Sequence, residues 1–198
     1  MNRSSNSSYD IAAADASVGN DAQRLNLGCG KDIRPGWINL DVARLPGVNV
    51  VHDLKILPLP FQDEQFDYVL AKDILEHVDY IPLLREIHRI LRIGGQLCIQ
   101  VPHFTSVDNY VDPTHQNRFS IRTLDFFVAN NGSGRDYYFD FSFRQMKHKH
   151  IGFARGPLFY NSWVEAFINL SARTQKYYEM TFLRSLFPAQ NILMYMVK

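Results

Sequence analysis

The chain has few cysteines, no long apolar run and almost no net charge, and each of these absences argues against a class of protein. Cys29 and Cys98 are its only cysteines, and neither belongs to a CxxC pair or a Cys/His zinc pattern. Such usage argues against a disulfide-stabilised secreted domain and favours a reducing compartment. No apolar run approaches the ~20 residues of a membrane helix, and the first residues lack an apolar signal-peptide core. We therefore expect a cytoplasmic protein without a membrane partner.

An excess of charge of one sign is also missing. The formal net charge is +1, from 21 basic and 20 acidic residues, so no overall field would attract nucleic acid. Hydrophobic residues make up 46% of the 198 positions, which is enough for one globular domain with its own core. Residues 1–22 are rich in Ser, Asn, Asp and Ala and are expected to form a flexible tail, which leaves 23–198 as a single domain.

Short apolar runs alternate with more helical segments from residue 24 onward. Runs of this length between turn residues are typical of buried parallel strands. Residues 74–93 carry apolar side chains at nearly helical spacing, and Gly94-Gly95 is a natural stop for that helix. The alternation predicts an α/β fold with a Rossmann-like, doubly wound sheet. The apolar runs that end in Gly, Asp or Pro are 25–27, 37–40, 48–51, 66–71 and 96–101.

The ends of these runs carry the residues that suggest a site. Gly28-Cys29-Gly30 follows the first run, and a Gly-x-Gly turn there requires close approach of the backbone or positive φ values. Asp41, Asp53 and Asp73 follow the next three runs. Ligands of doubly wound sheets bind beyond the carboxyl ends of the strands, so this edge is the candidate site. A tight turn without any ligand would give the same Gly-x-Gly pattern.

The glycines do not form a dinucleotide fingerprint. Ile33 stands where GxGxxG requires a small third residue, and Pro35-Gly36 interrupts the following crossover. Asp41 also follows the glycines much sooner than the ribose-binding acid of NAD domains does. No lysine follows at P-loop spacing. A ligand that carries no phosphate is therefore favoured.

A nucleoside attached to an amino acid is a ligand whose hydroxyl and amino groups would match these aspartates. Asp41 is placed to accept hydrogen bonds from two ribose hydroxyls, as expected of an acid at the end of the second strand. Asp53 and Leu54 would offer a carboxylate to an adenine amino group and a backbone amide to a ring nitrogen. Asp73 would lie near an α-amino group.

With these residues the chain resembles the class I S-adenosylmethionine-dependent methyltransferases of type 11, specifically a compact subgroup with GWINLD-like sequences. The resemblance rests on four segments in order: LNLGCG (25–30), INLDV (38–42), VVHDLKILPLPFQDEQFDYVLAKDILEHV (50–78) and LREIHRILRIGGQLCIQVPH (84–103). It implies S-adenosylmethionine as the cofactor, with S-adenosylhomocysteine as product. The implied cofactor-binding residues are Asn26, Gly28, Cys29, Gly30, Asp41, Asp53, Leu54, Asp73 and His77.

The resemblance also implies a seven-stranded sheet whose last two strands form a C-terminal antiparallel hairpin. Two β-like runs, at 177–183 and 191–197, are the candidates for these strands. Residues 104–165 would then form a substrate-specific insertion or cap, with a mobile loop at Gly132-Ser133-Gly134. Within this insertion, His148 and His150 are expected at the surface.

Candidates for chemistry follow the fifth strand. Methyl transfer from a sulfonium needs in-line positioning and, for a hydroxyl acceptor, removal of a proton. We predict that His103 or His115 is the base and that Asp112 orients it, because an imidazole with a pKa of about 6.5 accepts a proton at neutral pH. Alternatively, Asp112-Pro113 starts a turn and His115 bonds within the loop. A two-histidine, one-carboxylate metal site made of His103, Asp112 and His115 is a third interpretation, although a metal is not expected.

The substrate is predicted from the subgroup resemblance alone. A saccharide or natural-product hydroxyl is favoured, and the protein would act as a monomer or homodimer. Val101-Pro102-His103-Phe104 stands where base methyltransferases often carry Asn/Asp-Pro-Pro-aromatic, which disfavours nucleic acid. The alternatives are a nucleic-acid or protein methyltransferase, an aminopropyl transferase, and a non-catalytic methyltransferase-like binding module.

Overall fold

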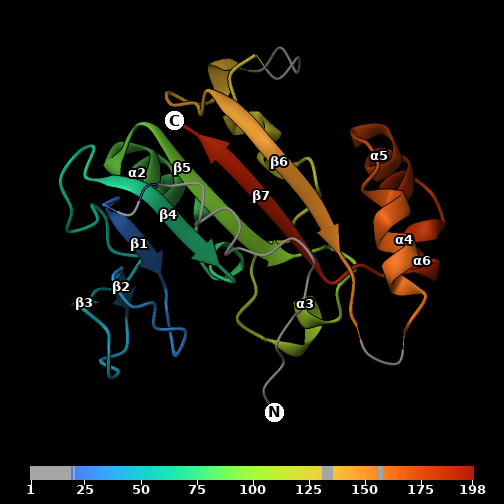
Figure 1. Ribbon diagram of the computed structural model, residues 1–198, viewed down its shortest axis with the longest axis horizontal. Helices are drawn as coiled ribbons and strands as arrows, with labels where there is room; N and C mark the ends of the chain where they lie inside the picture. The colour runs from blue at the N-terminus through green and yellow to red at the C-terminus, as the bar shows by residue number, and fades with distance from the viewer. Residues whose placement is uncertain (1–18, 20, 131–135, 156–157) are drawn as a thin grey trace.

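The computed structural model describes residues 19, 21–130, 136–155 and 158–198. The predicted tail at 1–22 lies outside these ranges except for residues 19, 21 and 22. The predicted loop at Gly132-Ser133-Gly134 lies outside them entirely. Within the described ranges, one mixed sheet runs through the molecule and helices pack around it (Figure 1).

Seven strands of the described residues form this sheet: β1 (Arg24–Leu27), β2 (Ile38–Asp41), β3 (Val50–Val51), β4 (Phe66–Lys72), β5 (Leu91–Pro102), β6 (Gln145–Gly152) and β7 (Asn191–Val197). Their order is β3-β2-β1-β4-β5-β7-β6. The first five strands are parallel to one another, whereas β7 runs antiparallel to both β5 and β6. The predicted doubly wound sheet of seven strands is confirmed.

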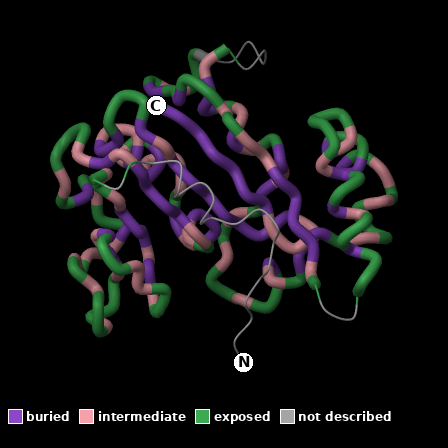
Figure 2. The backbone as a smooth tube through the Cα atoms, in the orientation of Figure 1, coloured by how far each residue is buried: buried purple, intermediate pink, exposed green. Residues whose placement is uncertain are grey.

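The helices of the described residues are η1 (Leu75–His77), α2 (Tyr80–Ile90), α3 (Asp108–Val111), η2 (Thr123–Phe127), η3 (Asp136–Tyr138), α4 (Asn161–Ile168), α5 (Ala172–Met180) and α6 (Leu183–Leu186). The side chain of Asp79 caps α2 by accepting from the Ile81 amide. One face of α2 is fully buried against the sheet through Leu83, Leu84, Ile87 and Ile90. Figure 2 shows the buried backbone that runs along the central strands.

The predicted helix 74–93 is shorter than expected. The segment forms two separate helices, η1 and then α2, which ends at Ile90. Gly94-Gly95 lies within β5 instead of closing the helix. A Cβ atom on Gly95 would lie 2.8 Å from the Arg92 carbonyl oxygen and 3.2 Å from that of Phe66. Glycine is therefore required at this position, because a side chain would clash first with the backbone of β5 itself and then with that of β4, where the register of the two strands shifts.

The predicted C-terminal hairpin is wrong in one of its two strands. The segment 191–197 is β7, but its partner is β6, and residues 177–180 belong to α5. Ser171 and Thr174 form a capping box at the start of α5. Gln175, Tyr178 and Glu179 are buried at helical spacing, so packing and capping outweigh the β-propensity of the tyrosines. The segment 104–165 includes β6, so part of the predicted insertion belongs to the sheet.

His150 is buried rather than exposed, which corrects the expectation for this residue. Its Nε2 lies 2.9 Å from Glu165 Oε1 on α4, and Arg155 also donates to that oxygen, at 3.0 Å. His148 is partly buried. α4 covers the last residues of β6 through this carboxylate.

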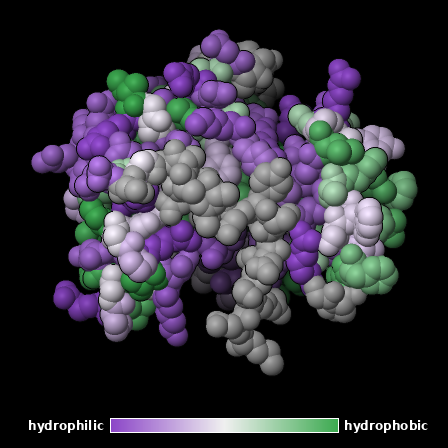
Figure 3. Space-filling model, in the orientation of Figure 1, coloured by the Kyte–Doolittle hydropathy of each residue, from purple (hydrophilic) through white to green (hydrophobic). Residues whose placement is uncertain are grey.

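Exposed hydrophobic side chains gather over α4–α6 (Figure 3). They include Trp163, Phe167, Tyr177, Met180 and Phe182. No helix in the described part of the chain is long and apolar enough to cross a membrane.

Candidate cofactor and acceptor site

The Gly-x-Gly turn follows β1 and has left-handed backbone at both glycines. The φ angles are +59° at Gly28 and +50° at Gly30. A Cβ on Gly28 would lie 1.9 Å from Ile74 Cδ1, whereas a Cβ on Gly30 would meet no atom within 4 Å. The turn therefore needs glycine for conformation at both positions, and Gly30 presents an open side. Burial, together with the nearby Asp41, raises the pKa of the Cys29 thiol, so it stays protonated at neutral pH.

Asp41 ties the end of β2 to this turn. Its Oδ2 accepts from the Gly30 amide at 2.7 Å, and its Oδ1 accepts from the Ala43 amide at 2.8 Å. An ionised carboxylate has about four acceptor positions, so two of them are left for other donors. The side chain is half-buried. Asp41 therefore fixes the glycine turn and still presents acceptors beside it.

Asn26 acts through a buried asparagine pair. Its Nδ2 donates to the Asp32 carbonyl at 2.8 Å and to Asn39 Oδ1 at 3.2 Å. Asn39 also accepts from the Arg34 amide and donates to the Arg34 and Trp37 carbonyls. The two side chains thus order the loop between β1 and β2. Asn39 was not predicted, although its position two residues before Asp41 in INLD would have indicated it.

Asp53, Leu54 and Asp73 follow the neighbouring strands. Asp53 Oδ1 accepts from the Lys55 amide at 2.9 Å in a tight turn after β3. Leu54 is buried, and its Cδ1 lies 3.8 Å from the position of a Cβ on Gly28, so the strand ends converge on the glycine turn. Asp73 has a φ of +55° after β4, and Gln100 Nε2 on β5 lies 3.3 Å from its Oδ1.

Glu76 and His77 meet the loop that carries Asp112 and His115. The imidazole rings of His77 and His115 lie 4.6 Å apart. Glu76, His77 and His115 form a group of potential metal ligands whose ligand atoms all lie within 4.8 Å of one another. Glu76 is 1% exposed, and burial raises its pKa to about 8. Burial also lowers the pKa of His77, with a further contribution from His115, so this imidazole is neutral at pH 7.

Asp112 does begin a turn, and its carboxylate also lies near both histidines, through Thr114 for His77 and directly for His115. Its Oδ1 accepts from the Thr114 amide at 2.8 Å and from the Thr114 hydroxyl at 2.6 Å. Thr114 Oγ1 lies 2.8 Å from His77 Nδ1, and Asp112 Oδ2 lies 3.9 Å from His115 Nε2. Asp112 and His115 are therefore brought together, as the acid–base prediction requires.

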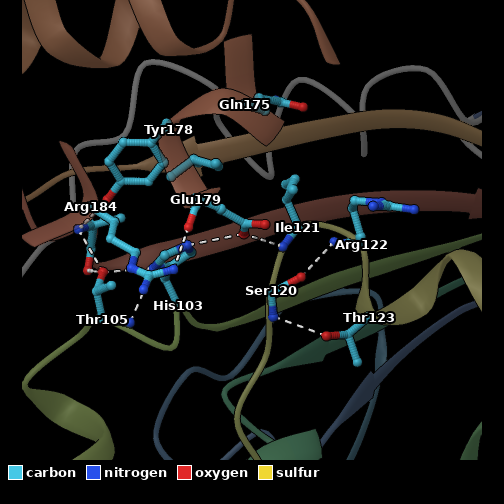
Figure 4. A network of polar contacts seen from close by, with 12 residues as sticks. His103, Thr105, Ser120, Ile121, Arg122, Thr123, Gln175, Tyr178, Glu179 and Arg184 are labelled. Atoms are coloured by element: carbon cyan, nitrogen blue, oxygen red, sulfur yellow. Dashed lines mark hydrogen bonds and ion pairs between the residues drawn. The ribbon is translucent and has the colours of Figure 1, made fainter. Parts of the chain in front are cut away.

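His103 lies in a different environment, beneath α5 (Figure 4). The side chain is fully buried; its Nδ1 accepts from the Thr105 amide at 3.2 Å, and its Nε2 lies 3.2 Å from Glu179 Oε1. The proton therefore lies on Nε2 and is donated to Glu179. The same carboxylate oxygen accepts from the Ile121 amide at 2.7 Å. Both ring nitrogens of His103 are thus occupied within the protein, and the group of potential metal ligands among the described residues contains His115 but not His103.

Residues 16–99 match a family model described as a methyltransferase domain. A demethylmenaquinone methyltransferase of Listeria welshimeri is 46% identical over 69 residues, which are 34% of this chain and 29% of that protein. An uncharacterized protein of Methanocaldococcus jannaschii is 52% identical over 46 residues, which are 23% of this chain and 20% of that protein. The matched segments span less than a third of the length of these curated relatives.

Solved structures match over nearly the whole chain. A SAM dependent methyltransferase from Archaeoglobus fulgidus has a TM-score of 0.58 at 20% identity and covers 94% of this chain and 90% of its own. The YcgJ protein from Bacillus subtilis has a TM-score of 0.58 at 16% identity, with 95% and 96% covered. At these identities the likeness shows the fold.

The sheet order, with antiparallel β7 between β5 and β6, is therefore that of a class I methyltransferase. The family match covers 84 of the 198 residues and supports the resemblance to the type-11 group of these methyltransferases. The family match falls on residues 16–99, which hold the Gly-x-Gly turn and all three strand-end aspartates. The resemblance inferred from the motifs is confirmed.

Proposed function

We propose that the protein transfers a methyl group from S-adenosylmethionine to a small molecule. The observation that carries this proposal is the convergence of the Gly28–Gly30 turn with Asp41 and Leu54 at the carboxyl edge of the sheet. The hydrogen-bonding groups of these residues suit a nucleoside joined to an amino acid, and they do not include a phosphate-binding lysine. The two cysteines are free and buried, which supports a cytoplasmic location.

The residues present fit the cofactor. Asp41 has acceptors to spare for ribose hydroxyls, and Gly30 leaves open space where a side chain would stand. Asp53 and Leu54 would hold the adenine, and Asp73 would lie near the amino group. S-adenosylmethionine supplies the electrophilic methyl group when it is bound. The protein has to bind and orient an acceptor and receive its proton.

For the acceptor we favour a hydroxyl oxygen of a saccharide or natural product, next to His115. The motif similarity to the compact methyltransferase subgroup supports this substrate class. The similarity to a demethylmenaquinone methyltransferase supports a small molecule more generally. His115 Nδ1 is buried and has no hydrogen-bond partner among the described residues, whereas both nitrogens of His103 are occupied. Of the two predicted bases, His115 is therefore the one that this geometry supports.

Calorimetric titration with S-adenosylmethionine and S-adenosylhomocysteine tests the cofactor. We expect micromolar binding by the wild type and at least roughly tenfold weaker binding by Asp41→Ala, because hydrogen bonds to a charged group contribute about 1.5–3 kcal/mol each. Asp140→Ala is the matched control, since Asp140 pairs with Arg85 in an exposed ion pair. No binding by folded wild-type protein would refute the proposal. Binding without methyl transfer to any screened small molecule would favour a non-catalytic module or a macromolecular substrate.

A further inference from the structure

We propose that Glu76, His77 and His115 bind a divalent transition-metal ion at the acceptor side of the site. The three residues come from η1 and from the loop after α3, and their ligand atoms lie within 4.8 Å of one another. The site itself follows from the contacts below. Its role in activating an acceptor rests on the methyl-transfer function proposed above.

The Glu76 carboxylate lacks the partners that a buried charge needs. It is 1% exposed, and neither oxygen has a hydrogen-bond partner on another of the described residues. Buried carboxylates in native proteins are normally hydrogen-bonded, paired with a cation or bound to a metal. A cation between Glu76 and the two imidazoles would supply what is missing.

The two histidines are oriented as metal ligands usually are. His77 Nδ1 lies 2.8 Å from Thr114 Oγ1, whose hydroxyl donates to Asp112 at 2.6 Å. His115 Nε2 lies 3.9 Å from the other oxygen of the same carboxylate. In metal sites, the ring nitrogen that does not bind the metal commonly contacts a carboxylate or hydroxyl, which fixes the tautomer. Here that arrangement leaves His77 Nε2 and His115 Nδ1 for the ion.

Backbone contacts hold the two segments in place. The Glu76 carbonyl accepts from the Gln116 amide at 2.7 Å and from the Asn117 amide at 3.2 Å. Asn117 Nδ2 donates to the carbonyls of Leu75 and Val78, at 2.9 and 2.7 Å. The loop is thus clamped along η1, directly beside the proposed ligands. Ligand sets that are supported in this way are more precise than sets on unsupported loops.

The donor set selects the class of ion. Two imidazole nitrogens and one carboxylate oxygen suit Mn²⁺, Fe²⁺, Co²⁺ or Zn²⁺, whereas Mg²⁺ and Ca²⁺ prefer oxygen ligands alone. Ligand atoms about 2.0–2.2 Å from a tetrahedral ion lie about 3.3–3.6 Å apart. Ions of this class therefore draw the three side chains together from a separation of at most 4.8 Å.

Three protein ligands leave coordination positions open for an acceptor oxygen. A metal lowers the pKa of a bound oxygen, as it does for bound water, so the hydroxyl can lose its proton to solvent at neutral pH. The oxygen then forms its bond to the methyl carbon while the carbon–sulfur bond breaks and the thioether leaves. In this arrangement His115 is a ligand, and the ion takes over the task assigned above to the imidazole base.

The test is titration of chelator-treated protein with Co²⁺, followed by its visible absorption, and with Zn²⁺ by calorimetry. We expect one ion per chain, with binding lost in Glu76→Gln and in His115→Gln. Thr114→Val removes the hydroxyl that joins His77 to Asp112 and should weaken binding by about 10–100-fold. His148→Gln is the control, because this partly buried histidine lies on β6 outside the group.

Two results would overturn the site: no stoichiometric binding by folded wild type, or binding by Glu76→Gln and His115→Gln equal to the wild type. Failure of the methyltransferase function is distinguishable, because S-adenosylmethionine is titrated separately in the presence of a chelator. Cofactor binding without ion binding refutes only the metal site. Ion binding without cofactor binding refutes the methyl-transfer function, and with it the ion's role there, but leaves the ion site standing.

Discussion

The buried Glu76 carboxyl should make the stability of the metal-free protein fall with rising pH. Its pKa is about 8 in the folded chain, against 4.5 for an ordinary glutamate, because burial disfavours the charged form. The folded state therefore holds the proton more tightly than the unfolded state does. The stability linked to Glu76 is fully present below pH 4.5 and is lost as the pH rises through 8.

The difference between 4.5 and 8 corresponds to roughly 5 kcal/mol, which is comparable with the whole stability of many domains. Glu76→Gln keeps the shape of the side chain and cannot ionise, so it should escape this loss. The free energy of unfolding, measured with urea at pH 5, 7 and 9 in the presence of a chelator, should fall steeply for the wild type and much less for the variant.

Glu86 provides a control of opposite sign. Hydrogen bonds from Arg89 hold its pKa below the usual value, so its contribution is present above pH 4.5 and is lost on acidification. Glu86→Gln should therefore cost stability at pH 7 and less at low pH. Parallel curves for the wild type and Glu76→Gln would refute the reasoning, since they would mean that Glu76 titrates as an exposed carboxyl does.

Further variants test the glycine turn and the network beneath α5. In urea unfolding, Gly30→Ala should lower the free energy of unfolding by about 1–2 kcal/mol because of its left-handed backbone alone. Gly28→Ala should cost more, because its new Cβ would also clash with Ile74, and adding Ile74→Ala should relieve only that additional cost. Equal losses for the two glycine variants would contradict this account. Glu179→Ala leaves the Ile121 amide and the His103 Nε2 proton without their acceptor, so we expect a loss of roughly 2–5 kcal/mol and a lower Tm, with a smaller loss for Glu179→Gln; a neutral Glu179→Ala would show that the network does not stabilise the fold.

The cofactor half of the fold is predictable because its signals are local. Each parallel strand is a short apolar run that ends in Gly or Asp, and the ends of parallel strands necessarily meet at one edge. Asp41 and the glycine turn are close in the chain, so their sequence alone places them together. The antiparallel half depends on contacts between distant residues. The partner of β7 is β6, and the tyrosines that suggested a strand at 177–183 lie on a helix whose capping box is a weaker signal.

The acceptor side was predicted only in part for the same reason. Spacing in the sequence placed Asp112 and His115 in one loop. The approach of this loop to Glu76 and His77 depends on hydrogen bonds that the backbone amides of Gln116 and Asn117 donate to the Glu76 carbonyl. Such contacts cannot be predicted from hydrophobic periodicity. His103 shows the reverse case, because its position at the end of β5 suggested an exposed base, whereas a carboxylate far along the chain, on α5, encloses it.

The position of β7 between β5 and β6 has a consequence for synthesis on the ribosome. Among the described residues, β6 is an edge strand that pairs with β7 alone, so it lacks this partner until residues 191–197 have left the exit tunnel. Until then one edge of β5 has no partner strand, and no neighbouring strand holds β6 in place beneath α4–α6. Chaperones that bind exposed apolar segments would find their targets in this half, while the parallel strands that converge on the glycine turn can already pair.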